Sequence, residues 1–398
     1  MGERSLPLAV RASVLGGLYL VQGLVFGVGG LVLLPQLVAA GVQLEHQAAI
    51  MALAGVPWVL KLAWAPALDT NAARRVGAGR IAAVAMVTIA AAVALIGALA
   101  DPSSAVLPIA VLWLVANAAL SLQDVATDAL AFDLLAAHER GRATAVMLGA
   151  HHVGAELLAG AWIGAVAATR GLGAACVLLA IVVLVLATLG LAMPRTSART
   201  HSSLATAVRA LAQDPRGAWA LATCGLVLAA DVATSAVTGE LLINHLGWTQ
   251  DDYVARVPTP LLLGNLAGYA SAVPFIDRFG HPRIARLGTL ALGACWIGFA
   301  LVESRWASPD FMVVFIVVQA FVTAWLYAGV HALILDVVHP ELRATQIAVL
   351  TAALNLPRVW APLAAAAAVP SLGLAGLFVA CGVWQIAMAL PLARMRSR

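Results

Sequence analysis

The chain has 398 residues, of which 62% are hydrophobic and only 11% are charged, and its mean hydropathy is +0.95. A soluble domain carries about 25% charged residues, so this chain has too few charges to cover a surface that faces water. The formal net charge is +4, but the basic residues lie in short connections between apolar runs. That distribution is typical of a membrane protein and argues against a nucleic-acid partner.

Apolar segments recur along the whole chain. A spanning helix needs about 20 mainly apolar residues, so the length leaves room for about twelve. The first apolar stretch, from Val10 to Ala40, is too long for the apolar core of a signal peptide, and we expect it to be a retained helix. The predicted spans are 9–40, 47–68, 81–100, 105–135, 142–169, 172–193, 216–245, 254–276, 285–302, 310–337, 344–369 and 372–393.

The basic residues predict the orientation in the membrane. If the N-terminus is cytoplasmic, the arginines on the opposite side are only Arg170, Arg256 and Arg305, whereas most of the 23 Lys and Arg residues fall in cytoplasmic connections. The positive-inside rule therefore places both termini in the cytoplasm. The four cysteines are isolated within apolar runs, so we expect no metal, no other cofactor and no disulfide framework.

The polar connection 194–215 divides the chain into two six-helix halves, 1–193 and 216–398. Acidic and basic residues at the ends of corresponding helices recur about 200 residues apart, which indicates an internal repeat. We expect these residues to set the conformational equilibrium through ion pairs between helices. They are Asp69, Asp133, Arg142, Asp277, Arg278, Asp336 and Arg343. Two parallel six-helix halves resemble the major facilitator architecture, an all-α membrane fold.

Ionisable residues within the membrane are costly unless they are paired or face water. The third, sixth and twelfth spans carry none, and the ninth carries only Arg286 at its cytoplasmic end, which predicts that these four spans surround a wet path lined by the others. Asp124 and Asp128 are four residues apart and share one helix face. They could couple transport to protons, or Asp128 could form a cytoplasmic latch with nearby arginines. His152 and Glu156 are also four residues apart. They could relay protons, or the glutamate could only provide a hydrogen-bond partner for the histidine.

Two cations also lie within predicted spans. Lys61 is the only lysine in the chain. It could hold an anionic group of a substrate, pair with Asp124 or Asp128, or extend to the cytoplasmic surface. Arg358 follows Pro357, where the helix could break, and it could contact an anion or pair with Asp231 or Asp336.

Several stretches resemble the AmpG-like permease family. The second span reads Gly-Val-Pro-Trp-Val-Leu-Lys-Leu-Ala-Trp-Ala-Pro from Gly55, and the fourth reads Gln-Asp-Val-Ala-Thr-Asp-Ala from Gln123. The run from Ala344 to Val359 and the Gln-Gly pair at Gln22 are also similar. The resemblance implies a proton-driven importer of muropeptides or siderophores, in which Lys61, Asp124, Asp128 and Arg358 are functional.

The chain departs from that family at two cations. His151-His152 stands where the family usually has Arg or Lys, and Ala229-Ala230 precedes Asp231 without the lysine often found there. These losses favour the siderophore-type branch over a strongly anionic muropeptide. Trp58 and Trp325 could stack on a ligand or could only pack. The candidate substrate contacts are Gln22, Trp58, Lys61, Gln123, Asp231, Trp325 and Arg358.

We therefore expect a monomeric, multi-pass protein of a bacterial inner membrane that imports a small organic solute together with protons. The two halves would give alternating access to a central site. A muropeptide importer and an exporter of a drug or biosynthetic product are the alternatives. The chain contains no Ser/His/Asp arrangement, metal-ligand spacing or phosphate-binding glycine loop, so we do not expect an enzyme.

Overall fold

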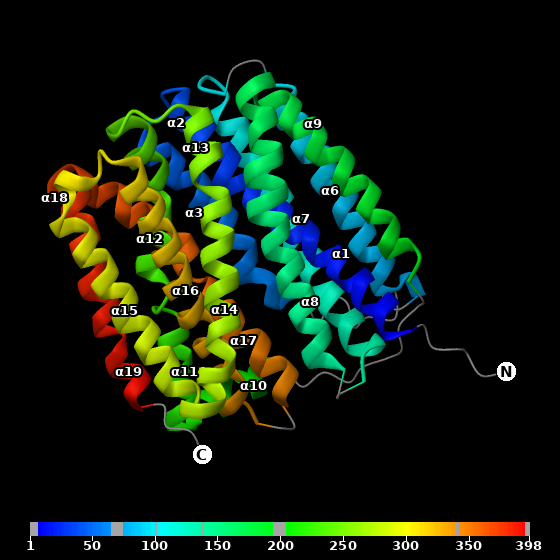
Figure 1. The fold of residues 1–398 in the computed structure, drawn as a ribbon. Coiled ribbons are helices and arrows are strands. Elements are labelled where there is room, and N and C mark those ends of the chain that lie inside the picture. The colour runs from blue at the N-terminus through cyan, green and yellow to red at the C-terminus, as the bar shows by residue number, and fades with distance from the viewer. Residues whose placement is uncertain are drawn as a thin grey trace. The chain divides into compact units, whose positions relative to one another are not determined.

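The computed structural model describes residues 7–64, 75–99, 102–136, 139–193, 204–339 and 342–394, and every regular element among them is helical (Figure 1). The N-terminal elements are α1 (Leu8–Gly27), the π-helix η1 (Val28–Leu33), α2 (Leu34–Ala39), α3 (Leu44–Leu60), the 3-10 turn η2 (Lys61–Ala63), α6 (Ala78–Gly97), α7 (Val106–Leu134), α8 (Arg140–His152), the π-helix η3 (Val153–Ile163) and α9 (Gly164–Leu191).

The C-terminal elements begin with a short helix that follows the polar connection. They are α10 (Leu204–Gln213), α11 (Pro215–Cys224), α12 (Ala229–Gly239), the π-helix η4 (Glu240–His245), α13 (Gln250–Arg256), α14 (Pro258–Phe279), α15 (His281–Leu301), the 3-10 turn η5 (Glu303–Arg305), α16 (Pro309–Val337), α17 (Arg343–Asn355), α18 (Pro357–Ala387) and α19 (Ala389–Arg394).

Nine helical runs in the described part of the chain are long and apolar enough to cross a membrane. Two of them, Ala143–Leu191 and Thr345–Ala393, have 49 residues each, about twice the length that one span needs. Each is interrupted by a glycine with positive φ, Gly171 (φ 83°) and Gly373 (φ 68°). With these two divisions and the 17-residue α3, each segment predicted from the sequence has a helical counterpart. The predicted all-α fold is confirmed.

The backbone repeats the internal symmetry seen in the sequence. Glycines with positive φ occur at corresponding places in the two halves, about 200 residues apart. The three pairs are Gly41 and Gly247 (φ 76° and 69°), Gly77 and Gly280 (φ 90° and 81°), and Gly171 and Gly373. Since a side chain with a Cβ rarely adopts this conformation, each glycine ends one helix or begins the next in the same manner in both halves.

Contacts between Cα atoms group the chain into two compact units. Unit 1 is Met1–Gln36 with Ala63–Thr200, and unit 2 is Leu37–Leu62 with His201–Arg398. The segment containing α3 therefore belongs by its contacts to unit 2, where it packs against α12, α17 and α18. A Cβ on Gly55 of α3 would lie 2.8 Å from the backbone carbonyl carbon of Arg358, so small residues allow this close approach. The division of the sequence into 1–193, 194–215 and 216–398 stays a prediction.

Within unit 1, α1 lies directly against α8 and η3. Gly23 and Gly27 face that neighbour, and a Cβ on either would overlap a backbone carbonyl, that of His151 or that of Ala155. Two glycines four residues apart on one helix face let two helix backbones approach closely in a membrane. This contact sets the distance between the polar residues of α1 and those of η3.

Within unit 2, an aromatic cluster joins α15, η5, α16 and α18. The Trp306 side chain is only 1% exposed, and its Nε1–H donates to the Phe299 carbonyl oxygen at 2.9 Å. Its ring stacks on Phe299 with centroids 4.5 Å apart, and Phe378 meets it edge-on at 6.0 Å. Such contacts add to the stabilisation from buried area.

Candidate functional site

Unit 1 contains a buried chain of polar side chains between α1 and α7. Gln22 Nε2 donates to Gln123 Oε1 at 3.2 Å, and Gln123 Nε2 donates to the Leu18 carbonyl oxygen and to Thr127 Oγ1 at 3.1 Å each. Gln22, Gln123 and Thr127 are all buried. Buried amides are stable only when their donors and acceptors are satisfied, and these bonds fix the rotation of α1 relative to α7.

The two carboxylates of α7 lie beside this chain. The Tyr19 hydroxyl on α1 donates to Asp128 Oδ1 at 2.7 Å, and the Asp124 side chain is buried. A tyrosine hydroxyl that donates to a carboxylate stabilises its ionised form. The predicted pair on one helix face is thus linked to α1 through a residue that was not among the site candidates.

His152 and Glu156 lie where α8 passes into the π-helix η3. His152 Nδ1 is 3.1 Å from Glu156 Oε1, and their side chains are 15% and 6% exposed. The His151 ring contacts both Phe26 and His152, with centroids 5.8 and 5.7 Å apart. Short π-helical segments are often found at functional sites because they shift the side chains out of the regular α-helical positions.

In unit 2 two helices are broken next to charged residues. Residues 225–228 separate α11 from α12, and Asp231 lies in the first turn of α12. Leu356, whose φ and ψ remain helical (−55° and −41°), is the single residue between α17 and α18, which begins at Pro357, so the proline interrupts the helical hydrogen bonding without ending the course of the helix. The breaks are neighbours, because a Cβ on Gly225 would lie 3.8 Å from Leu356 Cδ2. In many transporters, helices broken within the membrane form the substrate site.

The charged residues after these breaks act on one another. The Tyr327 hydroxyl donates to Asp231 Oδ2 at 3.2 Å, and Arg358 lies close enough for its charge to act on the same carboxyl. Arg358 Nε also donates to Asn355 Oδ1 at 3.0 Å. Of the two partners considered for Arg358 within the protein, the structure brings it to Asp231.

Lys61 follows α3 in the turn η2. Its charge acts on His331, whose Nδ1 lies 2.8 Å from the Tyr327 carbonyl oxygen. Because a carbonyl oxygen only accepts, that ring nitrogen carries the hydrogen. Trp58, one turn before Lys61, is buried. Tyr327 therefore contacts both His331, on which the charge of Lys61 acts, and Asp231.

Each unit contains a hydrogen bond from a tryptophan indole to a serine hydroxyl, and the tryptophan of one unit corresponds in position to the serine of the other. In unit 1, Trp64 Nε1, directly after η2, donates to Ser121 Oγ on α7 at 2.9 Å. In unit 2, Trp325 Nε1 on α16 donates to Ser271 Oγ on α14 at 2.8 Å. Trp64 and Ser271 occupy corresponding positions about 205 residues apart, as do Ser121 and Trp325. The Trp325 ring also contacts Phe275 and Phe321, at 5.1 and 5.9 Å between centroids.

The residues predicted to form conformational ion pairs are only partly described. Asp69 and the side chains of Arg142 and Arg343 lie outside the described residues, and Asp133 is exposed at the end of α7. Asp336 Oδ2 is 2.7 Å from His281 Nδ1, a partner not expected from the sequence. Arg278, beside Asp277 at the end of α14, lies over the Phe279 ring at 5.3 Å.

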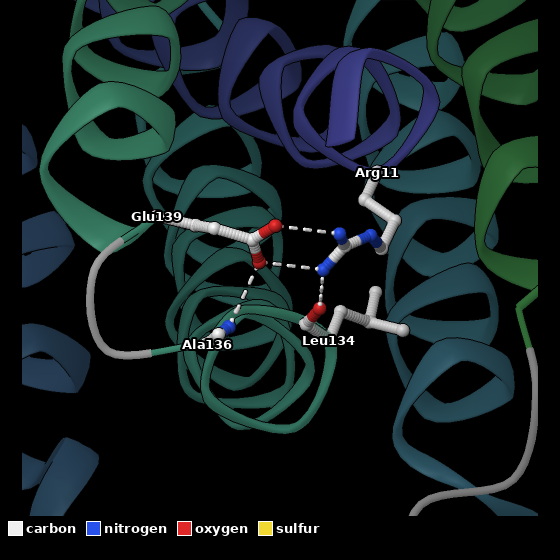
Figure 2. A network of polar contacts seen from close by, with 4 residues as sticks. All are labelled: Arg11, Leu134, Ala136 and Glu139. Atoms are coloured by element: carbon white, nitrogen blue, oxygen red, sulfur yellow. Dashed lines mark hydrogen bonds and ion pairs between the residues drawn. The ribbon is translucent and has the colours of Figure 1, made fainter. Parts of the chain in front are cut away.

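An ion pair in unit 1 was missed by the sequence analysis. Figure 2 shows the Arg11 guanidinium of α1 facing the Glu139 carboxylate, with two bonds of 2.8 Å, and also donating to the Leu134 carbonyl oxygen. Glu139 Oε2 further accepts from the Ala136 backbone N–H at 2.9 Å. One arginine thus holds the end of α7 and the start of α8. Sequence spacing alone does not pair Glu139 with a residue 128 positions away.

No protein-family model matches the chain. Solved structures with similar folds include the nucleoside transporter NupG (12% identity, 97% of this chain and 99% of that chain, TM-score 0.74) and a D-xylose-proton symporter (17%, 97% and 96%, 0.74). An auto-inhibited peptide transporter of the POT family is similar over 98% of this chain and 97% of its own (12% identity, TM-score 0.74). With this coverage and the apolar helices described above, the chain has the major facilitator fold and is a multi-pass membrane protein.

Proposed function

We propose that the protein is a secondary active transporter that carries a small organic solute across a bacterial inner membrane together with protons. The fold supports this proposal, since its structural neighbours are named as transporters of a nucleoside, a sugar and peptides, one of them with protons. The observation that carries it is the pair Asp124 and Asp128 on one face of α7, with Asp124 buried and Asp128 bonded to Tyr19. Carboxyls within a membrane are costly and typical of proton pathways.

The proposed substrate contacts in unit 2 are Asp231, Arg358 and Lys61, and those in unit 1 are Gln22 and Gln123. The charge of Arg358 acts on the Asp231 carboxyl, so the site offers a positive and a negative group within electrostatic range of each other. Such a pair suits a solute with both polar donors and acceptors better than a polyanion. Together with the resemblance to AmpG-like permeases, this favours a siderophore-type cargo over a muropeptide.

Uptake into proteoliposomes tests the proposal. The probes are a radiolabelled ferric hydroxamate siderophore and a radiolabelled anhydromuropeptide, each with an inward proton gradient. We expect accumulation of the siderophore that stops when a protonophore is added. Asp124→Asn and Asp128→Asn are expected to lower gradient-driven uptake at least about tenfold, whereas Asp251→Asn, an exposed residue of α13, leaves uptake unchanged.

Three outcomes would redirect the proposal. Uptake that is unaffected by the protonophore would refute proton coupling. Accumulation of only the muropeptide would instead identify the protein as a muropeptide importer. Accumulation of substrate inside everted vesicles, driven by protons that leave the vesicles, would instead support an exporter.

A further inference from the structure

The seventh predicted span is interrupted by four residues that do not continue the helix, and three of them, Gly225, Val227 and Leu228, are buried. Residues 225–228 form a turn between α11 and α12 instead of continuing the helix. Leu226 in this turn and Leu356 in the neighbouring break are both exposed. Hydrocarbon offers no hydrogen-bond partners, so irregular backbone at membrane depth needs partners from the protein.

A tryptophan from α18 supplies such a partner. Trp384 Nε1 in α18 donates to the Leu226 carbonyl oxygen at 3.2 Å, and the same oxygen accepts from the Ala229 backbone N–H at 3.1 Å. A carbonyl oxygen has two lone pairs, so these two donors satisfy it fully. The Trp384 ring is 37% exposed and meets the Trp360 ring at 67°, with centroids 6.3 Å apart.

The turn held by Trp384 leads directly to a charged residue of the candidate site. Asp231 is two residues after Ala229, which begins α12. Its carboxylate accepts a hydrogen bond from the Tyr327 hydroxyl and interacts electrostatically with Arg358. Arg358 is two residues before Trp360 in α18. Movement of the turn would therefore rotate the first turn of α12 and displace Asp231 from both partners.

We propose that Trp384 is a positioning residue: its indole N–H holds the turn 225–228 in place and thereby fixes Asp231 beside Tyr327 and Arg358. The role of Asp231 in substrate binding rests on the proposed function, but the geometry of the turn does not. A ring without the N–H would keep the contact with Trp360 while leaving one lone pair of the Leu226 oxygen without a donor.

Thiol labelling of the intact protein tests this proposal without a substrate. Cys224, the last residue of α11, is 2% exposed, and Cys176 in unit 1 is equally buried and serves as an internal reference. We expect Trp384→Phe to accelerate alkylation of Cys224 by N-ethylmaleimide about fivefold, because the adjacent turn opens more often. Alkylation of Cys176 should not change. The matched control is Trp360→Phe, which removes the neighbouring indole N–H but keeps the bond to Leu226.

A second measurement reports on Asp231 itself. Dicyclohexylcarbodiimide reacts with protonated carboxyls in apolar surroundings, and peptide mass spectrometry can compare Asp231 with Asp128 in the same molecules. An Asp231 that has lost the Tyr327 hydroxyl is more accessible to the reagent, so its labelling in Trp384→Phe should rise by about threefold, with Asp128 unchanged. The proposal is overturned if Cys224 and Asp231 react as in the wild type, if Trp360→Phe has the same effect, or if Cys176 accelerates equally. Failure of the uptake test alone would leave these results intact.

Discussion

Replacing Gly23 or Gly30 of the first span by alanine should change the stability of the protein in opposite directions. Gly23 in α1 faces η3 so closely that a Cβ would overlap the His151 carbonyl oxygen. Gly30 in η1 is exposed, and a Cβ there would meet no atom within 4 Å. Gly23 lies in the α-helix α1 and Gly30 in the π-helix η1, and neither has a positive φ. Alanine can adopt both backbone conformations, so the expected difference between the two substitutions comes from packing.

The magnitudes follow from that difference. Alanine is favoured over glycine within a helix by about 0.5–1 kcal/mol, because it loses less backbone entropy on folding. Gly30→Ala should gain about that much. Gly23→Ala gains the same term but forces α1 away from η3, and overpacking of a rigid contact costs about 1–3 kcal/mol or more. Because the obstacle is backbone, we expect the upper part of that range and a net loss of about 2 kcal/mol.

Thermal unfolding, monitored by thiol labelling, distinguishes the expected loss of stability in Gly23→Ala from the expected gain in Gly30→Ala. Cys176 in α9 is buried, and it is the cysteine of unit 1, so its reaction with a fluorogenic maleimide reports the opening of that unit. For a domain of 150–250 residues, 1 kcal/mol shifts Tm by about 2–4 °C. Gly23→Ala should lower Tm by about 4–8 °C, and Gly30→Ala should raise it by about 1–4 °C. Equal shifts of the same sign would refute the reasoning from close helix contact.

The remaining predictions concern polar and aromatic contacts. Arg11→Lys should lower the Tm of unit 1 by several degrees, because lysine cannot make the two parallel bonds to Glu139; Arg80→Lys, at an exposed residue of α6 in the same unit, serves as the control in the same thiol assay. Tyr19→Phe should lower gradient-driven proteoliposome uptake severalfold, because Asp128 loses the donor that links it to α1; unchanged uptake would remove Tyr19 from the coupling mechanism. Trp306→Leu should destabilise unit 2 by about 3 kcal/mol in thermal unfolding. Trp162→Phe, at a side chain that is 48% exposed, should leave Tm unchanged.

The sequence predicted the spans well because each is a long apolar run bounded by polar residues. Two connections without a polar loop, predicted between residues 169 and 172 and between 369 and 372, lie at or next to Gly171 and Gly373, whose positive φ interrupts the helices. Pro357 likewise marked an interruption, as its missing N–H breaks the helical hydrogen bonding. The break at 225–228 was not predicted, because its residues, Gly-Leu-Val-Leu, are as apolar as the helices around them.

The candidate site was predictable in residue type but not in pairing. Charges within spans pointed to Asp124, Asp128, Asp231 and Arg358, because ionisable residues there are rarely without a role. Tyr19 and Trp384 gave no comparable signal, since aromatic residues are common in membrane helices as anchors and packing residues. Which partner a charge meets depends on helix rotation, and the rotation is set by contacts such as that of Gly23, which no spacing rule reveals.

The exchanged tryptophan–serine bonds restrict how the two halves could have diverged. Each unit keeps one large and one small side chain in the same volume, with the indole entering from opposite helices. Changing one member alone would pass through a state with two serines, which leaves a partly buried gap, or with two tryptophans, which clash. A chain that descends from two identical halves must therefore have altered both positions almost together, and a designed exchange, Trp64→Ser with Ser121→Trp, would retrace that step in one unit.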